Sequence, residues 1–485
     1  MEYESVIGLE IHIQLGTASK MFCSCSNQGE YQPPNTTVCP ICLGHPGTLP
    51  VVNKKAFEYG AKLALAINCQ INQKSKFDRK HYFYPDLPKG YQISQYDQPL
   101  AADGHVLART DSGEVRIRIE RLHLEEDAAK NFHVDNKTLV DFNRSGSPLA
   151  EIVTKPDFKT PEQAVAFLKQ LRLIVRYLEV SDGDMEKGHL RCDVNVSLRP
   201  KGDSKLYAKT EIKNVNSFRS VEKALEYEIK EQTRLWEEGN PPKSLRTLGW
   251  REGDKQTVVQ RVKEEAMDYR YFPEPDLPPL VITDSELTKW KNDLPELPYD
   301  KYRRLLEEYQ LKPMAARQLV DDKDLSAYFE QSCGELKGLV DNEEAEPLAK
   351  TVYGWLTSEL IKLCNVQGIG VKECKINPAQ FALFLSFIVR RQINSTNGQI
   401  LLKEMFDTGN DPESILSEKD LEMVKDLDLD ELAKGIVNTH PKEAESYKAG
   451  KKNLFQFFVG LLMKETKGKA DPKAVREAIE KVLGE

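Results

Sequence analysis

Apolar and polar positions alternate near the start of the chain. Leu9, Ile11 and Ile13 alternate with Glu10 and His12, a period of two that is typical of a strand with one buried face. Similar short runs, separated by glycine and proline, continue to about residue 280 and predict a strand-rich first domain. A carboxylate and an imidazole two residues apart on a strand share a face, which suits a metal or proton-transfer site. An ordinary solvated strand face is the alternative.

Two later runs also place polar residues together. The segment 116–127 alternates, but its apolar positions change parity between Ile119 and Leu122, which predicts a bulge or a strand break. The segment 191–199 alternates without interruption. Dispersed carboxylates on a sheet fit a metal and nucleotide site, because Mg²⁺ takes a few oxygen ligands and leaves room for phosphate; a wet sheet face is again the alternative. The polar residues on or directly after these runs are Glu125, Glu126, Asp193 and Asn195.

Two stretches of the first part have helical features. Thr160 as N-cap, Pro161 in the first turn and Gln163 as capping-box residue predict a helix that ends before residue 181. A second helix is expected from near Ser220 to Glu238, where a following Asn-Pro-Pro run stops it. The polar segment 211–217 precedes it and fits either substrate recognition or a capping turn.

Changes in composition along the chain indicate where its domains begin and end. The proline-dense run 271–279 excludes a helix or an internal strand, and the pattern is helical almost throughout after residue 298. Residues 401–437 hold eleven acids and four basic residues, whereas 447–473 hold seven lysines and two acids. We therefore expect domains at 1–292, 293–407 and 408–485. The lysines flank an apolar helix, which suits a phosphate backbone or, alternatively, a protein partner.

The cysteines suggest one metal site. Cys23 and Cys25 are followed after thirteen residues by Cys39 and Cys42, the spacing of a tetrahedral, all-thiolate zinc site; coincident free cysteines are the alternative. Four thiolates leave no open coordination position, so this zinc would be structural. The remaining five of the nine cysteines are scattered, which indicates reduced thiols. Together with an acidic N-terminus unlike a signal peptide, this favours a cytoplasmic protein.

Overall composition, net charge and a search for known nucleotide-binding motifs limit the classes of protein to which the chain can belong. With 40% hydrophobic and 30% charged residues the chain is a globular protein, and its longest apolar stretch, 381–389, is too short to span a bilayer. The formal net charge of −8 excludes a uniformly basic nucleic-acid-binding protein. Neither a Walker A sequence nor G-x-G-x-x-G occurs, so nucleotide would bind in another kind of site. The aromatic and basic run 77–86 could stack a base, although an aromatic patch is more often core.

Seven longer motifs occur between residues 6 and 276, and they carry a resemblance that spans nearly the whole chain. They are VIGLEIHI at 6–13, KFDRK at 76–80, YFYPD at 82–86, YQISQ at 91–95, LEED at 124–127, LRCDVN at 190–195 and DYRYFPEPD at 268–276. Together they resemble the GatB family, the B subunits of tRNA-dependent amidotransferases that act on Glu-tRNA(Gln) and Asp-tRNA(Asn).

This resemblance implies an α+β fold: an antiparallel-sheet cradle related to the glutamine synthetase fold, an all-helical domain and a small tail of the GatB/YqeY type that binds tRNA. It implies a ligase that activates the misacylated amino acid with ATP as an acyl phosphate. Ammonia would come through a tunnel from an amidase subunit, in a heterotrimer with a small third subunit. We expect neither DNA nor a membrane as a partner.

The resemblance and the motifs also suggest roles for residues. Mg²⁺ would be held by Glu10, His12, Glu125 and Glu151, with the choice between Glu125 and Glu126 left open and with Asp193 close by. All six of these residues are candidate catalytic residues. The structural Zn²⁺ would be held by Cys23, Cys25, Cys39 and Cys42. Candidates for substrate or nucleotide binding are Arg79, Lys80, Tyr82, Lys89, Arg191, Asn195, Lys213, Asn214 and Ser217.

The chain departs from the family pattern in places. A four-cysteine site occurs in only some members, and the segments 391–398 and 453–458 differ from the usual pattern, so tRNA contacts there are not carried over. One alternative is a non-enzymatic, zinc-containing RNA-binding protein. Another is a self-sufficient amide ligase, but the chain has no G-x-S-x-G or S-x-x-K sequence for releasing ammonia from glutamine.

Overall fold

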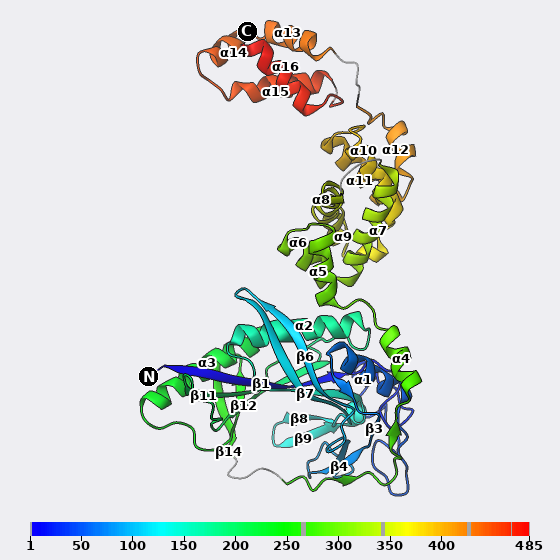
Figure 1. The fold of residues 1–485 in the computed structure, drawn as a ribbon. Helices are drawn as coiled ribbons and strands as arrows, with labels where there is room; N and C mark the ends of the chain where they lie inside the picture. Colours follow the sequence, from blue (N-terminus) through cyan, green and yellow to red (C-terminus); the bar gives the residue numbers. More distant parts are fainter. Residues whose placement is uncertain (1, 263–267, 341–344, 424–427, 467, 485) are drawn as a thin grey trace. The chain divides into compact units, whose positions relative to one another are not determined.

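The computed structural model describes residues 2–262, 268–340, 345–423, 428–466 and 468–484. The chain divides into two compact units, Met1–Asp300 and Lys301–Glu485, which Figure 1 shows in sequence colours. Among the described residues, no helix combines the length and the apolar character needed to cross a membrane.

A nine-stranded sheet forms the centre of the first unit. Its order is β14-β13-β12-β11-β1-β10-β7-β6-β2, and the neighbours are antiparallel except for the parallel pair β12 and β13. This large sheet with its helices agrees with the expected α+β class. The strands are β1 (Tyr3–Gln14), β2 (Gln70–Ile71), β6 (Ala101–Thr110), β7 (Gly113–Glu126), β10 (Pro148–Thr154), β11 (Leu190–Pro200), β12 (Thr210–Lys213), β13 (Arg246–Arg251) and β14 (Gln256–Val262).

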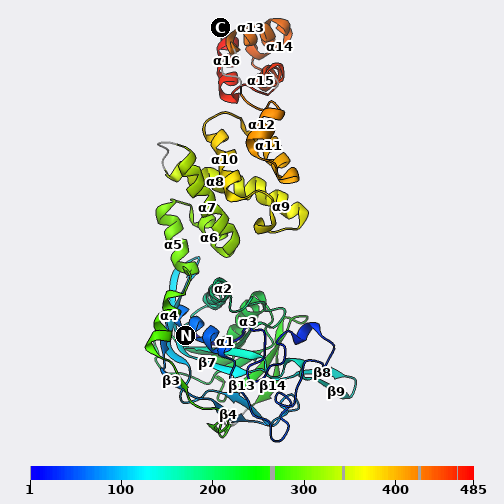
Figure 2. The ribbon, with the colours of Figure 1, turned by 90° about the vertical axis from the view of Figure 1, so that its right-hand side faces the viewer.

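Three helices cover one face of this sheet: α1 (Lys54–Ala66), α2 (Pro161–Tyr177) and α3 (Phe218–Glu237), as Figures 1 and 2 show. The apolar residues of β1 join the helices in one core, and Ile11 and Ile13 are completely buried. The prediction from the alternation in β1 is confirmed, because only a strand with one covered face separates apolar from polar positions in this way.

The starts of α2 and α3 test the capping predictions. The Thr160 side chain accepts a hydrogen bond from Gln163 N, so the predicted N-cap is confirmed. The capping-box assignment of Gln163 is wrong, since its side chain accepts from Lys159 N instead of the N-cap amide. Helix α3 begins two residues before the predicted start, because the Ser217 side chain caps it by accepting from Ser220 N.

The predicted irregularity in 116–127 is a bulge. Val153 of β10 pairs with Arg121 of β7, but the next residue, Thr154, pairs with Ile119, so Glu120 is the extra residue. The buried apolar positions change parity across it, from Ile119 to Leu122. The strand continues through the bulge and is not broken.

Shorter sheets border the other face of the large one. The three-stranded sheet has the order β15-β4-β5, and its edge strand β15 contains Pro273, in keeping with the exclusion of an internal strand at 271–279. These short strands are β4 (Asp78–His81), β5 (Tyr91–Ser94) and β15 (Phe272–Pro273), with the pairs β3 (Lys74–Ser75) and β16 (Leu280–Val281), and β8 (Lys130–Val134) and β9 (Lys137–Asp141).

The second unit is helical in its described residues. The helices α13 to α16 enclose a small core that includes Phe458, Leu462 and Ile479. Of the seven lysines in 447–473, Lys467 lies outside the described residues. The remaining helices of the chain are α4 (Asp284–Asn292), α5 (Pro298–Glu308), α6 (Pro313–Asp321), α7 (Lys323–Leu339), α8 (Ala345–Trp355), α9 (Ile361–Gln367), α10 (Pro378–Val389), α11 (Ser395–Thr408), α12 (Pro412–Glu418), α13 (Leu429–Thr439), α14 (Pro441–Lys448), α15 (Leu454–Glu465) and α16 (Pro472–Gly484).

Candidate functional site

A polar cavity of about 680 Å³ lies on the face of the large sheet that carries Glu10 and His12. The sheet forms its floor, and residues of β4 and of the segment 268–271 contribute to its wall. Nine of the sequence-predicted residues meet here, although they come from six strands and a loop. They are Glu10, His12, Lys80, Tyr82, Glu125, Glu151, Arg191, Asp193 and Lys213.

The floor contains a row of side chains that runs across four strands. His12 pairs with Arg191 on one side and with Glu151 on the other, and Glu151 pairs with His123. His12 Nε2 lies 3.4 Å from Glu151 Oε2 and 3.5 Å from Glu125 Oε1. His123 Nε2 lies 3.3 Å from the same oxygen of Glu151. The antiparallel registers thus bring two imidazoles and two carboxylates together.

A second row lies one pleat further along the strands. Glu10 pairs with Asp193 in the register of β1 with β11. Lys213 donates a hydrogen bond to Asp193 Oδ2 at 2.5 Å, and its Nζ lies 3.4 Å from Glu211 Oε1. A lysine therefore neutralises part of the carboxylate charge at this side of the cavity.

Two overlapping groups in the floor have the geometry for a cation. Glu10, His12 and Glu151 form one group, and His123, Glu125 and Glu151 form the other. In each group one ligand atom from every residue lies within 4.8 Å of the others. Glu151 belongs to both, so an ion in either group would contact the same side chain.

Neighbouring charges set the protonation of these groups. Burial opposes ionisation of Glu151, but His123 and His12 hold its pKa well below the usual value. Burial also opposes charge on His12, yet the hydrogen bond and the charge of Glu151 raise its pKa to about 9. In contrast, burial and the nearby Glu151 raise the pKa of Glu10. The lowered pKa of Glu151 and the raised pKa of His12 therefore favour an ion pair between these two side chains.

The wall of the cavity adds a cation and aromatic rings. Lys80 lies 5.2 Å from the ring centroid of Tyr269. Burial opposes its charge, but Glu125 and Glu151 raise its pKa, so it stays an ammonium group. Burial raises the pKa of Tyr82 and raises that of Tyr271 to about 12. Both phenols therefore keep their protons near neutral pH and can donate hydrogen bonds.

The sequence did not decide whether Glu125 or Glu126 is a metal ligand, and the two side chains point to opposite sides of β7. Glu125 lines the cavity, whereas Glu126 lies on the other side of β7, where it forms an ion pair with Lys89 and accepts from Ile93 N at 3.0 Å. Because successive residues of a strand face opposite ways, only one of the two can reach the cavity.

Five predicted binding residues lie outside the cavity lining. Arg79 forms a bidentate ion pair with Glu274, at 2.7 and 2.8 Å, and lies over the Tyr91 ring. Ser217 caps α3 and does not face the cavity. The other three are Lys89, Asn195 and Asn214. The cluster in the sequence segment 211–217 is thus divided, and only its lysine and Glu211 face the cavity.

Sequence reasoning missed His123, Asp127 and Arg144. Asp127 pairs with both Arg144 and Arg191 at the cavity. The alternation after the bulge in β7 contained the signal, since residues 123, 125 and 127 alternate with Leu122 and Leu124, which belong to the apolar core.

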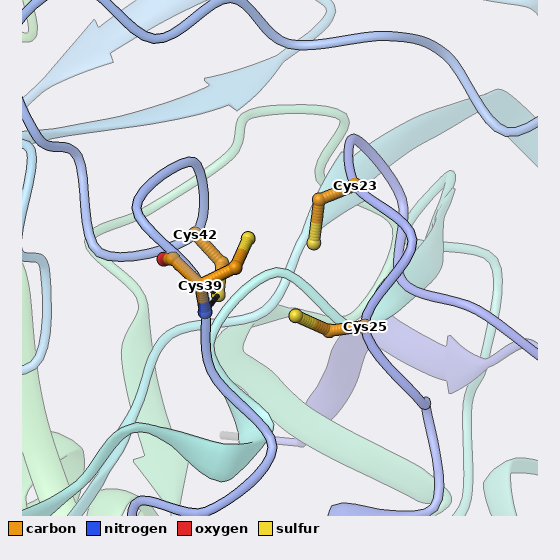
Figure 3. Close-up of side chains that lie close together, drawn as sticks. All are labelled: Cys23, Cys25, Cys39 and Cys42. Carbon is orange, nitrogen blue, oxygen red and sulfur yellow. Dashed lines mark hydrogen bonds between the residues drawn. The ribbon is translucent and has the colours of Figure 1, made fainter.

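The four spaced cysteines come together in the first unit (Figure 3). Their sulfur atoms lie within 4.8 Å of one another, and a tetrahedral zinc with Zn–S distances of about 2.3 Å would place them roughly 3.8 Å apart. Cys42 Sγ accepts from Cys39 N at 3.2 Å. The donor set and spacing therefore fit a zinc ion. All nine cysteines are free thiols, so no disulfide framework exists.

Comparison with known proteins defines the class. Residues 5–288 match the family described as GatB/GatE catalytic domain, and residues 336–483 match the GatB domain. Over its full length, the chain is 48% identical to the full-length B subunit of the Aspartyl/glutamyl-tRNA(Asn/Gln) amidotransferase from Thermodesulfovibrio yellowstonii. The identity is 46% to the corresponding full-length protein from Persephonella marina and 45% to that from Thermotoga maritima, which is covered to 99%.

The class is therefore that of the amidotransferases, which are ligases, and the chain contributes one subunit type of such an enzyme. The chain belongs to the GatB family. The resemblance of the seven motifs is confirmed, and membership of an enzyme family argues against a non-enzymatic RNA-binding protein.

Proposed function

We propose that the chain is the ATP-dependent kinase and transamidase subunit that converts Glu-tRNA(Gln) to Gln-tRNA(Gln), Asp-tRNA(Asn) to Asn-tRNA(Asn), or both. The names of the relatives supply the two tRNAs and the amide transfer. The observation that carries the proposal is the cavity itself, in which Glu10, Glu125 and Glu151 surround His12 beside the ammonium group of Lys80.

Activation of the substrate is the first requirement. A carboxylate is a poor electrophile, and its phosphorylation to an acyl phosphate provides a leaving group that an amine can displace. The transferring phosphoryl group carries negative charge, which Lys80, Arg191 and Lys213 would offset from the wall and floor. Glutamine-derived ammonia must then reach the acyl phosphate before water, which a closed path between subunits would favour.

Magnesium, when bound, would neutralise and orient the phosphate oxygens. Three carboxylates of the floor offer the oxygen ligands that Mg²⁺ prefers, so the donor set fits. In this proposal Glu10, His12, Glu125 and Glu151 hold the ion, and Asp193 stays close to it through its pairing with Glu10. Lys213 limits the excess negative charge beside them.

Ammonia would come from a partner glutaminase subunit in a heterotrimer with a small third subunit. The word subunit in the relatives' name supports a larger assembly. The cysteines outside the four-cysteine site also favour this view. Burial raises the pKa of Cys69 and Cys364 to about 12 and raises that of Cys192 well above its ordinary value, so these thiols are poor nucleophiles.

The remaining assignments concern domains. We infer a cradle at 1–292 related to the glutamine synthetase fold, a helical domain at 293–407 and a tRNA-binding tail at 408–485. The exposed Lys448, Lys451, Lys452 and Lys464 of the tail support binding of a phosphate backbone. Zinc at the four cysteines would stabilise the first domain and take no part in the reaction.

The test uses the complex of this chain with its amidase partner. Replacing Glu10 by Ala should abolish ADP formation that depends on charged tRNA, while tRNA affinity stays unchanged, because the tail is intact. Glu226→Gln, an exposed residue of α3, serves as the matched control. Unchanged ATP turnover in Glu10→Ala refutes the site.

A second measurement tests the source of ammonia. The isolated chain should use concentrated ammonium salts weakly and glutamine not at all until the amidase subunit is added. Amidation from glutamine by this chain alone would refute the partner proposal.

A further inference from the structure

Lys20 is a lysine without any contact with solvent. Its exposed fraction is 0%, and it is among the largest fully buried side chains of the chain. Its Nζ donates to Thr37 O at 2.8 Å, to Phe142 O at 3.5 Å and to Cys42 Sγ at 3.8 Å. The three acceptors match the three N–H bonds of an ammonium group.

Within the described part of the chain, Lys20 forms no ion pair with a carboxylate. Two of the three acceptors are neutral carbonyl oxygens, and the third is a cysteine sulfur. A buried ammonium group loses its hydration, which costs several kcal/mol unless a negative charge lies close by. Lys89 illustrates the usual solution in this fold, since its largely buried ammonium group is paired with Glu126.

The four-cysteine site can supply the missing negative charge. Four thiolates around one Zn²⁺ leave two negative charges in excess. Cys42 is one of the four and is the cysteine that Lys20 contacts, and it also accepts from Cys39 N. The metal-loaded site therefore offers Lys20 an anionic partner.

We propose that Lys20 is the charge-compensating residue of the zinc site, a positioning residue that acts on the ion through Cys42. The inference rests on the proposed zinc. Lys20 reduces the repulsion among the thiolates and holds Cys42 in place. Its contacts with the Thr37 and Phe142 carbonyls tie the cysteine loop to η2 (Phe142–Arg144). Outer partners of metal ligands typically change metal affinity by 10- to 100-fold.

The test compares zinc-loaded and zinc-stripped full-length chain. Lys20→Met removes the charge and keeps most of the volume, and Lys54→Met, an exposed lysine at the start of α1, is the matched control. Zinc affinity is measured by competition with a chelator, and the unfolding temperature of both forms is measured in parallel. Lys20→Gln, which retains N–H donors for the two carbonyls, provides the same comparison if Lys20→Met does not fold.

The expected result differs between the two forms. Lys20→Met should lower zinc affinity by about 10- to 100-fold and lower the unfolding temperature of the loaded chain, whereas the unfolding temperature of the stripped chain should fall less, because the two excess negative charges of the zinc-loaded site are absent there. Lys54→Met should change neither. Equal destabilisation of both forms, or unchanged zinc affinity, overturns the role of Lys20. Wild-type chain that binds no zinc overturns the zinc site itself.

Discussion

Substitutions at the adjacent residues Glu125 and Glu126 give the sharpest test of the site. The two residues have the same side chain and similar burial, but only the side chain of Glu125 points into the cavity. Both side chains are almost fully buried and both are ionisable, with exposed fractions of 2% and 3%. Glu125 lies between His12 and His123, whereas Glu126 pairs with Lys89. Replacing each by Gln removes one negative charge and preserves the shape.

The two substitutions should have opposite consequences. In Glu125→Gln a ligand of the proposed cation loses its charge, and we expect kcat/KM for tRNA-dependent ADP formation to fall roughly 100-fold, which corresponds to about 2.7 kcal/mol. In Glu126→Gln the largely buried Lys89 loses its partner, which should cost about 3 kcal/mol of stability. For a unit that spans Met1–Asp300, that loss lowers the unfolding temperature by roughly 5 °C.

The assay measures ADP release as a function of ATP concentration with saturating charged tRNA, which gives kcat/KM for ATP, at a temperature well below unfolding of either variant. Thermal unfolding is followed separately on the same preparations. Glu126→Gln should retain wild-type kcat/KM. Glu125→Gln should lower the unfolding temperature less than Glu126→Gln does, because His12 and His123 keep Glu151 as a partner. Loss of activity in Glu126→Gln with an unchanged unfolding temperature would show that the direction of the two side chains has been misjudged.

Three further outcomes are expected. Metal analysis of the reduced chain should find about one zinc per chain. Cys25→Ser should lower the unfolding temperature, whereas the rate of ADP formation measured below that temperature should change little. His123→Asn should reduce the rate of ADP formation, whereas the control His133→Asn, at an exposed position, should not. Kinetic assays of both variants check this. Deleting 408–485 should raise the KM for charged tRNA and weaken the dependence of binding on salt, measured by titration at several salt concentrations.

The features that the sequence predicted correctly are those that depend on the local pattern of residues. The alternation in β1 separated Glu10 and His12 from the core, and Thr160 marked the start of α2. The bulge in β7 was visible as a change of parity. Each of these features follows from neighbouring residues along the chain, where the periods of strand and helix differ.

The partners of those residues could not be predicted in the same way. His123 comes close to His12 only because β10 lies between β1 and β7, and strand order depends on packing of the whole sheet. The same holds for Lys20, whose burial depends on residues more than a hundred positions away. A cluster in the sequence is also a weak guide, since Lys213 faces the cavity while Ser217, four residues later, caps a helix.

The shared position of Glu151 has a consequence for how mutational effects combine. His12 Nε2 and His123 Nε2 lie 3.4 and 3.3 Å from the same oxygen, Glu151 Oε2. A substitution that weakens the interaction of one imidazole with this oxygen changes the strength of its interaction with the other imidazole. The energetic effects of substitutions in the two groups are therefore coupled. Effects of substitutions at Glu10 and at Glu125 should therefore be non-additive, and a double-mutant cycle between these two residues, which belong to different groups, would report a coupling free energy. Glu151 contributes to it as the member that both groups share, and so does the contact of His12 with Glu125.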